Sequence, residues 1–508
     1  MDASSKKLHF FSLFALLVVA SLLAFGSLTK GHDWGDDFAS YIMQARSVVE
    51  FDPQTFVEAN LFTLTHSEIV RIPLVYPWGA PVILAPAYAA FGLDIHALKI
   101  PNVACFLMFL LTLFLFARGY HSSVFTLFVV AIFSTSPLLL MELNRIGSDI
   151  PFMLASTLSM LLIDATVMRG RRLICKNWDA SILGLCLATS ISIRPNGWLL
   201  VLTLLFAHAL KLRAAQRSIH FDHTLTVETH SRAQVTLPYI SCGTALLVWN
   251  IIFPVSISRL SAVPPITPEI FNQNTLVYLL LPSQFFYGAP YPLIFYSGAL
   301  GFVVLGVRAS WARTPHFLFY CGTTLGLLVL WPFYQGVRFI LPIVPFFFHF
   351  MLEGVRTVRS QLGPRGVKLF DAVSLSVGVL LIGSLCLASV AGVQKNLRDQ
   401  RMPIEGPFSK EAREMFNFIS TQTDPDDVIV FFKPRLMRLL TERRSFDSGS
   451  RVALEQSDYI CLFKGPVEST GAGRFPQALY DELTQQGLIQ PVFVNDQFLV
   501  GRSNPASR

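Results

Sequence analysis

Charged residues are scarce in this sequence of 508 residues. Only 14% of the residues are Asp, Glu, Lys or Arg, whereas 52% are hydrophobic. A soluble globular protein carries about 25% charged residues, so the composition excludes an ordinary soluble enzyme. The sequence also has no Gly-Xaa-Yaa period, no heptad run and no low-complexity tract. We therefore predict a polytopic α-helical membrane protein.

Cysteine is rare and scattered, which limits the kinds of site the chain can hold. The seven cysteines form no CxxC pair. Five of them lie in apolar runs, where cysteine behaves as a small hydrophobic residue, and Cys175 and Cys461 stand alone in polar segments. This pattern indicates neither a zinc site nor a disulfide framework.

Eleven apolar runs are candidates for membrane spans, since a spanning helix needs roughly 20 apolar residues. The first follows Lys6 and Lys7 and is longer than the apolar region of a signal peptide, so we expect an uncleaved anchor. A shorter, proline-rich run at 76–92 decides the orientation of everything after it, according to whether it crosses. The eleven runs lie near residues 9–29, 98–117, 123–141, 150–168, 179–193, 197–212, 236–257, 293–307, 316–334, 339–352 and 370–393.

The distribution of basic residues favours a surface position for 76–92. In that arrangement 17 Lys and Arg share the side of the N-terminus, against 8 on the other side before Gly392. Cytoplasmic loops of membrane proteins carry the excess of Lys and Arg. We therefore predict about eleven spans in the cell (inner) membrane, with the N-terminus in the cytoplasm. Residues 30–97 then form an outer loop with juxtamembrane helices.

The composition changes near Gln394. Residues 394–508 carry 15 basic and 15 acidic residues, and their pattern predicts a small soluble α/β domain outside the cytoplasm, after a transmembrane catalytic domain at 1–393. This segment contains no catalytic motif that we can identify. The predicted elements are helices at 409–420, 434–440 and 476–486, strands at 427–432 and 459–463, and a hairpin at 492–500 with an Asn-Asp turn.

Several charged side chains fall on the predicted outer face, at or near the ends of spans. Asp36 and Asp37 are adjacent and follow the first apolar run, and Asp149, Arg194 and Arg338 each mark a span end. Such charges are costly unless they are paired or face a water-filled cavity. The alternatives are an acidic helix cap for the aspartate pair and snorkelling or boundary marking for the others.

The ordered set of these segments resembles the GT-C class of membrane glycosyltransferases, which includes protein O-mannosyltransferases, lipid A aminoarabinose transferases and lipopolysaccharide-core galacturonosyltransferases. The resemblance covers most of the chain. It is carried by Trp34-Gly35-Asp36-Asp37 with Tyr41 and Ala45, by Tyr76-Pro77-Trp78-Gly79-Ala80-Pro81, by Ser148-Asp149-Ile150-Pro151-Phe152, by Arg194-Pro195-Asn196-Gly197, and by Gln335-Gly336-Val337-Arg338-Phe339-Ile340-Leu341-Pro342.

The resemblance implies transfer of a sugar from a polyprenyl-phosphate donor to an acceptor hydroxyl at the outer face, with inversion at the anomeric carbon. Asp36 matches the first acidic position of the family, which implies that it is the general base. Asp149 is then expected to orient the acceptor or the base. Asp37 is expected to do the same or to bind a divalent cation, the one cofactor that remains possible.

The implied donor-phosphate ligands are Arg194 and Arg338, joined by Arg71 on the same side, because a guanidinium pairs a phosphate bidentately and stays charged. Tyr41 and Tyr76 are the expected substrate-binding residues. The sequence departs from the family at two places. Many relatives have Asp-Glu where this chain has Asp36-Asp37, and the aminoarabinose group has Lys where this chain has Tyr76.

Two other functions remain open at this point. Spans broken by Pro and Gly beside charged residues also suit a secondary transporter or flippase for a lipid-linked or anionic substrate. A non-catalytic assembly protein is a third reading. The partners expected of the enzyme are the lipid-linked sugar, a hydroxyl-bearing lipid, glycan or protein, and membrane lipids, with no nucleic acid; the residues do not specify which sugar or acceptor.

Overall fold

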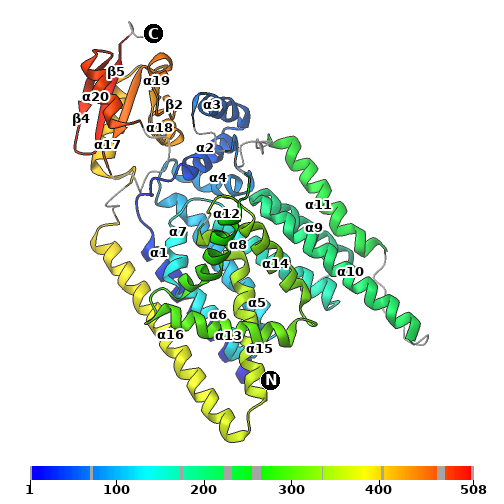
Figure 1. The fold of residues 1–508 in the computed structure, drawn as a ribbon. Helices are drawn as coiled ribbons and strands as arrows, with labels where there is room; N and C mark the ends of the chain where they lie inside the picture. The colour runs from blue at the N-terminus through cyan, green and yellow to red at the C-terminus, as the bar shows by residue number, and fades with distance from the viewer. Residues whose placement is uncertain are drawn as a thin grey trace.

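The computed structural model describes residues 3–68, 73–171, 176–221, 232–254, 265–334, 336–401, 406–465 and 475–504. The helices up to residue 398 form one bundle, and the C-terminal residues form a separate sheet layer at one end of it (Figure 1). The α-helices of the bundle are α1 Ala3–Ser27, α2 Asp37–Val49, α3 Pro53–His66, α4 Gly79–Phe91, α5 Ile100–Arg118, α6 Ser123–Ser134, α7 Pro137–Leu143, α8 Asp149–Leu162, α9 Lys176–Ile193, α10 Trp198–Phe221, α11 Arg232–Ile252, α12 Pro268–Leu280, α13 Pro292–Ser310, α14 Pro315–Val329, α15 Val344–Ser360 and α16 Pro364–Arg398.

Each of the eleven apolar runs contains a helix, which confirms a polytopic helical membrane protein. Within the described ranges, eight helices are long and apolar enough to span, or nine if α6 and α7, bent by 52° at their junction, are one broken span. The estimate of about eleven is therefore higher than these criteria support. The two remaining runs form α9, which begins with the polar segment 176–179, and α14, which has only 15 residues.

The run at 76–92 forms α4, a helix of 13 residues. At 1.5 Å per residue it is about 20 Å long, too short for a hydrocarbon core of about 30 Å. It packs against α2 and α9 at the end of the bundle that carries the C-terminal residues (Figure 1). Gly79 permits this packing, because a Cβ there would lie 2.6 Å from the carbonyl oxygen of Ser192.

Small residues let the membrane helices approach closely elsewhere in the bundle. Helices α13 and α15 are in close contact, and a Cβ on Gly306 would lie 1.8 Å from the carbonyl oxygen of Phe350. A Cβ on Gly354 would lie 1.9 Å from the carbonyl oxygen of Phe302. Side chains larger than hydrogen at these two positions would force the helices apart.

The C-terminal residues form a five-stranded mixed sheet with the order β2-β1-β3-β5-β4. Strand β1 pairs in parallel with β2 and β3, whereas β5 pairs antiparallel with β3 and β4. The predicted helices, the two strands and the hairpin are all present, and Ser409 caps its helix as expected. The sequence prediction missed β2 and α19. The elements are α17 Lys410–Gln422, β1 Val428–Val430, α18 Pro434–Thr441, β2 Arg444–Phe446, α19 Val452–Gln456, β3 Tyr459–Phe463, α20 Gln477–Gln485, β4 Ile489–Val494 and β5 Phe498–Ser503.

The sheet shares one hydrophobic core with residues of the segment 30–97, which we call the outer loop after its predicted position. The ring of Trp34 lies 5.3 Å from Phe432, 5.4 Å from Phe463 and 6.1 Å from Phe498, centroid to centroid. Buried residues of α2, α4, α17 and α18 complete the same cluster. Helix α16 runs past residue 394 to Arg398 and leads into this layer. The outer loop therefore packs against the C-terminal layer as well as against the bundle.

Candidate active site

Asp37 lies at the first position of α2, where the helix dipole favours a carboxylate. Its Oδ1 accepts a hydrogen bond of 2.6 Å from the Tyr76 hydroxyl. Its Oδ2 lies 3.6 Å from Nη1 of Arg338, and the two side chains are 43% and 32% exposed. The structure thus brings three of the predicted site residues together, and the Asp37 carboxylate and the Arg338 guanidinium both remain accessible.

Tyr76 is held from its side chain and from its backbone. Its ring stacks on Tyr41 at a centroid distance of 4.8 Å. Gln44 accepts a hydrogen bond from the Tyr76 amide at 3.1 Å and donates one to the Tyr76 carbonyl at 2.9 Å. Burial raises the pKa of Tyr76 well above its usual value, and the charge of Asp37 raises it further. Tyr76 therefore stays protonated and donates to Asp37.

Tyr41 connects α2 to the segment that precedes α8. Its hydroxyl donates to Ser148 Oγ at 3.1 Å, in the residue before α8. Burial raises the pKa of Tyr41 to about 12, against the opposing charge of Arg194. The hydroxyl is thus a hydrogen-bond donor at neutral pH, and it fixes α2 relative to the start of α8.

Asp149 and Arg194 form a buried ion pair. Asp149 begins α8, Arg194 precedes a short 3₁₀ turn, and Arg194 Nη2 lies 2.5 Å from Asp149 Oδ1. Gly197 lets this turn fold tightly, because a Cβ there would lie 2.5 Å from the amide nitrogen of Ile191. Charges buried to this degree are stable only when paired, so Asp149 holds Arg194 in place.

Phe339 joins the two arginines of the site. The guanidinium carbon of Arg194 lies 4.4 Å from the centre of the Phe339 ring, and that of Arg338 lies 5.4 Å from it. Gly336, with a φ of +70°, makes the turn that presents Arg338. Burial lowers the pKa of Arg338, but Asp149 and Asp37 outweigh it and raise the value above the ordinary one. Arg338 is therefore fully charged.

Asp36 points to different neighbours. It is 7% exposed, its Oδ1 accepts a hydrogen bond of 3.3 Å from the Leu436 amide, and its Oδ2 lies 4.0 Å from Arg435 Nε. Burial raises the pKa of Asp36, although Arg435 and Lys433 act to lower it. The structure thus directs the first carboxylate of the pair toward α18 and the second toward Arg338.

Arg71 lies outside the described residues. Glu142, near the end of the bent helix pair, is buried and pairs with Arg145 at 3.0 Å. The sequence signal that could have indicated Glu142 is its position at the end of an otherwise apolar run. Phe339 directly follows Arg338 in the sequence, but nothing in the sequence indicates its contact with both arginines.

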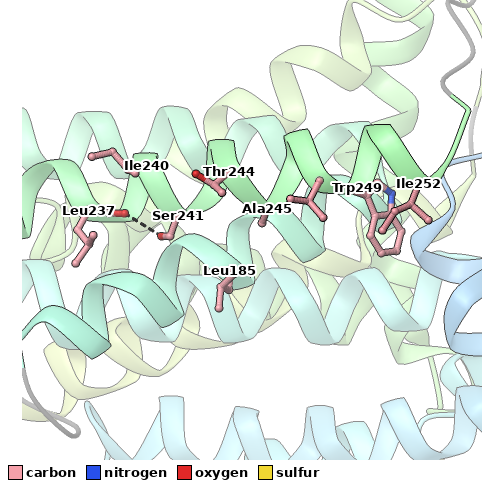
Figure 2. A pocket seen from close by; sticks show the side chains of 9 residues that line it. Leu185, Leu237, Ile240, Ser241, Thr244, Ala245, Trp249 and Ile252 are labelled. Carbon is pink, nitrogen blue, oxygen red and sulfur yellow. Dashed lines mark hydrogen bonds between the residues drawn. The ribbon is translucent and has the colours of Figure 1, made fainter.

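Over the described ranges, no group of three or more His, Cys, Asp or Glu side chains could hold a metal ion. The structure does contain an apolar groove of about 470 Å³ along one face of α11, with Leu185 of α9 at its floor (Figure 2). The groove is not at the Asp37–Arg338 pair. Trp249 at one end of it contacts Phe253 with the two rings tilted at 49°, and Phe253 stacks in turn on Trp78 at 5.1 Å.

The fold is that of the GT-C membrane glycosyltransferases. The chain is similar to ArnT from Cupriavidus metallidurans in its apo state, with a TM-score of 0.60, 12% identity, and coverage of 100% of this chain and 99% of that one. ArnT bound to undecaprenyl phosphate gives a TM-score of 0.61, 10% identity, and coverage of 97% and 98%. AglB from Archaeoglobus fulgidus, in complex with an inhibitory peptide and a dolichol-phosphate, gives a TM-score of 0.57 and 11% identity, with coverage of 91% of this chain and 70% of that one. No protein-family model and no curated protein matches the chain by sequence.

Proposed function

We propose that this protein transfers a sugar from a polyprenyl-phosphate donor to a hydroxyl group of a lipid, glycan or protein acceptor, with inversion at the anomeric carbon. The observation that carries the proposal is the accessible Asp37 carboxylate 3.6 Å from the accessible Arg338 guanidinium. Sugar transfer from a phosphate needs a proton acceptor and a cation side by side. The GT-C fold and the lipid phosphates bound in similar structures support this choice of donor.

Asp37, not Asp36, is the base in this proposal. Asp37 faces Arg338 and is partly open to solvent, whereas Asp36 is buried against α18. In the reaction, Asp37 takes the proton of the acceptor hydroxyl as the acceptor oxygen bonds to the anomeric carbon. The bond between that carbon and the phosphate oxygen breaks, and its electron pair leaves with the polyprenyl phosphate.

The cations have separate tasks. Arg338, paired with Asp37 only at 3.6 Å, is free to turn its remaining donors to the phosphate. Arg194 is fixed by Asp149 at 2.5 Å, and it contacts the same Phe339 ring as Arg338. It therefore adds positive charge at a fixed position. Tyr76 holds the Asp37 carboxylate, and Tyr41 holds Ser148 at the start of α8. Asp149 acts as a positioning residue for Arg194.

The groove along α11 suits part of the polyprenyl chain. Its lining is apolar apart from two hydroxyl side chains (Figure 2). The aromatic series from Trp249 through Phe253 to Trp78 leads from it to the segment that carries Tyr76. An isoprenoid chain seated there would have its phosphate end directed to that segment.

The site is proposed to face the outside. The N-terminal end of α1 and the C-terminal layer lie at opposite ends of the bundle (Figure 1), and the active-site residues share the end of the C-terminal layer through their contacts with α18. The predicted excess of basic residues on the N-terminal side favours a cytoplasmic position for that side.

Purified protein in detergent, given short-chain polyprenyl-phosphate sugars and an envelope lipid extract as acceptor, tests the function. We expect acceptor-dependent release of polyprenyl phosphate and a product of inverted anomeric configuration by NMR. Reconstituted vesicles test the transporter alternative with the same donors. Movement of intact donor across the bilayer, without cleavage, would replace the proposal by the transporter reading.

A further inference from the structure

Arg435 belongs to the C-terminal layer, but its contacts are with the outer loop. The side chain is fully buried, at 0% exposure. Its Nε donates to Asn60 Oδ1 at 3.2 Å, and its Nη2 donates to the carbonyl oxygen of Pro73. Its guanidinium carbon lies 5.5 Å from the centre of the Tyr76 ring. One side chain of α18 thus bonds both to α3 and to the segment just before Tyr76.

A buried guanidinium needs a countercharge, and Asp36 supplies it. The Asp36 carboxylate lies 4.0 Å from Arg435 Nε and also accepts from the Leu436 amide. Arg438, one turn further along α18, is a half-buried cation. Burial lowers its pKa to about 10, the charge of Arg435 lowers it too, and Asp36 counteracts them. Asp36 therefore stabilises the docking of α18, which accounts for its position away from Arg338.

Tyr76 connects Arg435 to Asp37, the proposed base. Tyr76 contacts Arg435 with its ring, stacks on Tyr41, and donates its hydroxyl to Asp37 at 2.6 Å. Displacement of the ring by an ångström would displace the hydroxyl, and with it the carboxylate it holds. Misplacement of that size can lower an enzymatic rate by about 10²-fold.

We propose that Arg435 is a positioning residue for sugar transfer: from the C-terminal layer it fixes the Tyr76 ring and, through the Tyr76 hydroxyl, the Asp37 carboxylate. The inference rests on the proposed function, in which Asp37 is the base. It makes the C-terminal layer a participant in the chemical step, where the sequence analysis expected no catalytic motif.

The test is a double-mutant cycle in the full-length protein, with Arg435→Met, Tyr76→Phe and the double variant. We expect Arg435→Met to lower kcat between about tenfold and 10²-fold, with the KM for the donor within about twofold. Because Arg435 acts through Tyr76, the double variant should be no slower than the slower single variant. Arg413→Met, which removes an exposed arginine of α17, is the matched control and should leave kcat unchanged. Multiplied effects in the double variant would overturn the proposal.

A readout without catalysis separates this proposal from the function itself. Carbodiimide labelling of Asp37, measured by mass spectrometry against the exposed Asp496 of the hairpin turn, should rise severalfold in Arg435→Met. If Arg435→Met alone does not fold, the variant Arg435→Met/Asp36→Leu replaces the buried pair by apolar groups, which is often neutral for stability; transfer should stay low in it. Unchanged Asp37 labelling in either folded variant overturns the positioning role. Raised labelling in a protein that transfers no sugar upholds the coupling and overturns the function.

Discussion

The two adjacent aspartates should respond in opposite ways to the same substitution. Asp37→Asn keeps the shape of the side chain at a partly exposed position and removes the proton acceptor. Transfer should fall by about 10²–10⁴-fold, which is about 2.7–5.4 kcal/mol at 1.36 kcal/mol per tenfold. The free energy of unfolding should change by no more than about 1 kcal/mol, the value of a charge at a helix N-terminus.

Asp36→Asn keeps an acceptor for the Leu436 amide but leaves the buried Arg435 without its countercharge. Breaking a buried pair in this way costs about 3–5 kcal/mol of stability. The variant should therefore show a large fall in its thermal midpoint and a smaller loss of transfer per folded molecule than Asp37→Asn.

The assay is initial transfer rate per folded molecule, with donor affinity and thermal midpoint measured on the same preparations. Donor affinity should change little in Asp37→Asn. If Asp36→Asn abolished transfer at an unchanged thermal midpoint while Asp37→Asn remained active, the base would be Asp36, and the assignment from side-chain direction would be refuted.

Three further predictions concern the cation, the interface and the orientation. Arg338→Ala should weaken donor binding by about 1.5–3 kcal/mol and slow transfer; unchanged affinity by equilibrium titration would exclude it as a phosphate ligand. Burial raises the pKa of Glu68, but hydrogen bonds from Ser448, Ser450 and the Gly449 amide outweigh it and hold the pKa below its usual value. The stability that these hydrogen bonds contribute is therefore complete above the ordinary glutamate pKa and is lost as the pH falls through the lowered pKa of Glu68. Release of the C-terminal layer by protease should increase over that fall in pH, and Glu68→Gln should remove this pH dependence. A reporter that is active only in the cytoplasm should stay inactive when fused after Arg508, and activity would reverse the proposed orientation.

The sequence was most informative where one physical rule acts locally. Apolar runs predicted the membrane helices, since the backbone must satisfy its own hydrogen bonds in lipid. Ser409 and the Asn-Asp turn marked a helix start and a hairpin by their local chemistry. The short strand β2 at 444–446 escaped because three residues carry too little periodicity to be told from a loop.

The candidate site shows where such rules end. Successive residues of a helix point about 100° apart, so Asp36 and Asp37 cannot both face Arg338, and the choice depends on what packs against α2. The deciding contact comes from α18, because Leu436 is 400 residues away from Asp36 in the chain. Arg435 likewise carries no local signal of its contact with Tyr76. The motifs predicted which segments carry the candidate site, and the tertiary contacts of Asp36 and Asp37 are the basis for proposing Asp37 as the base.

The core shared by Trp34 with Phe432, Phe463 and Phe498 also sets the order in which the protein matures. A chain is synthesised at about 5–20 residues per second, so the 400 residues between Asp36 and Leu436 take roughly 20–80 s. Throughout that time the outer loop has left the ribosome without the aromatic partners that bury it. The nascent chain can insert all its helices and still lack the packed outer loop. If the proposed function is correct, we expect transfer only once the C-terminal layer has been synthesised, and a chain that stops before it should be inserted but inert.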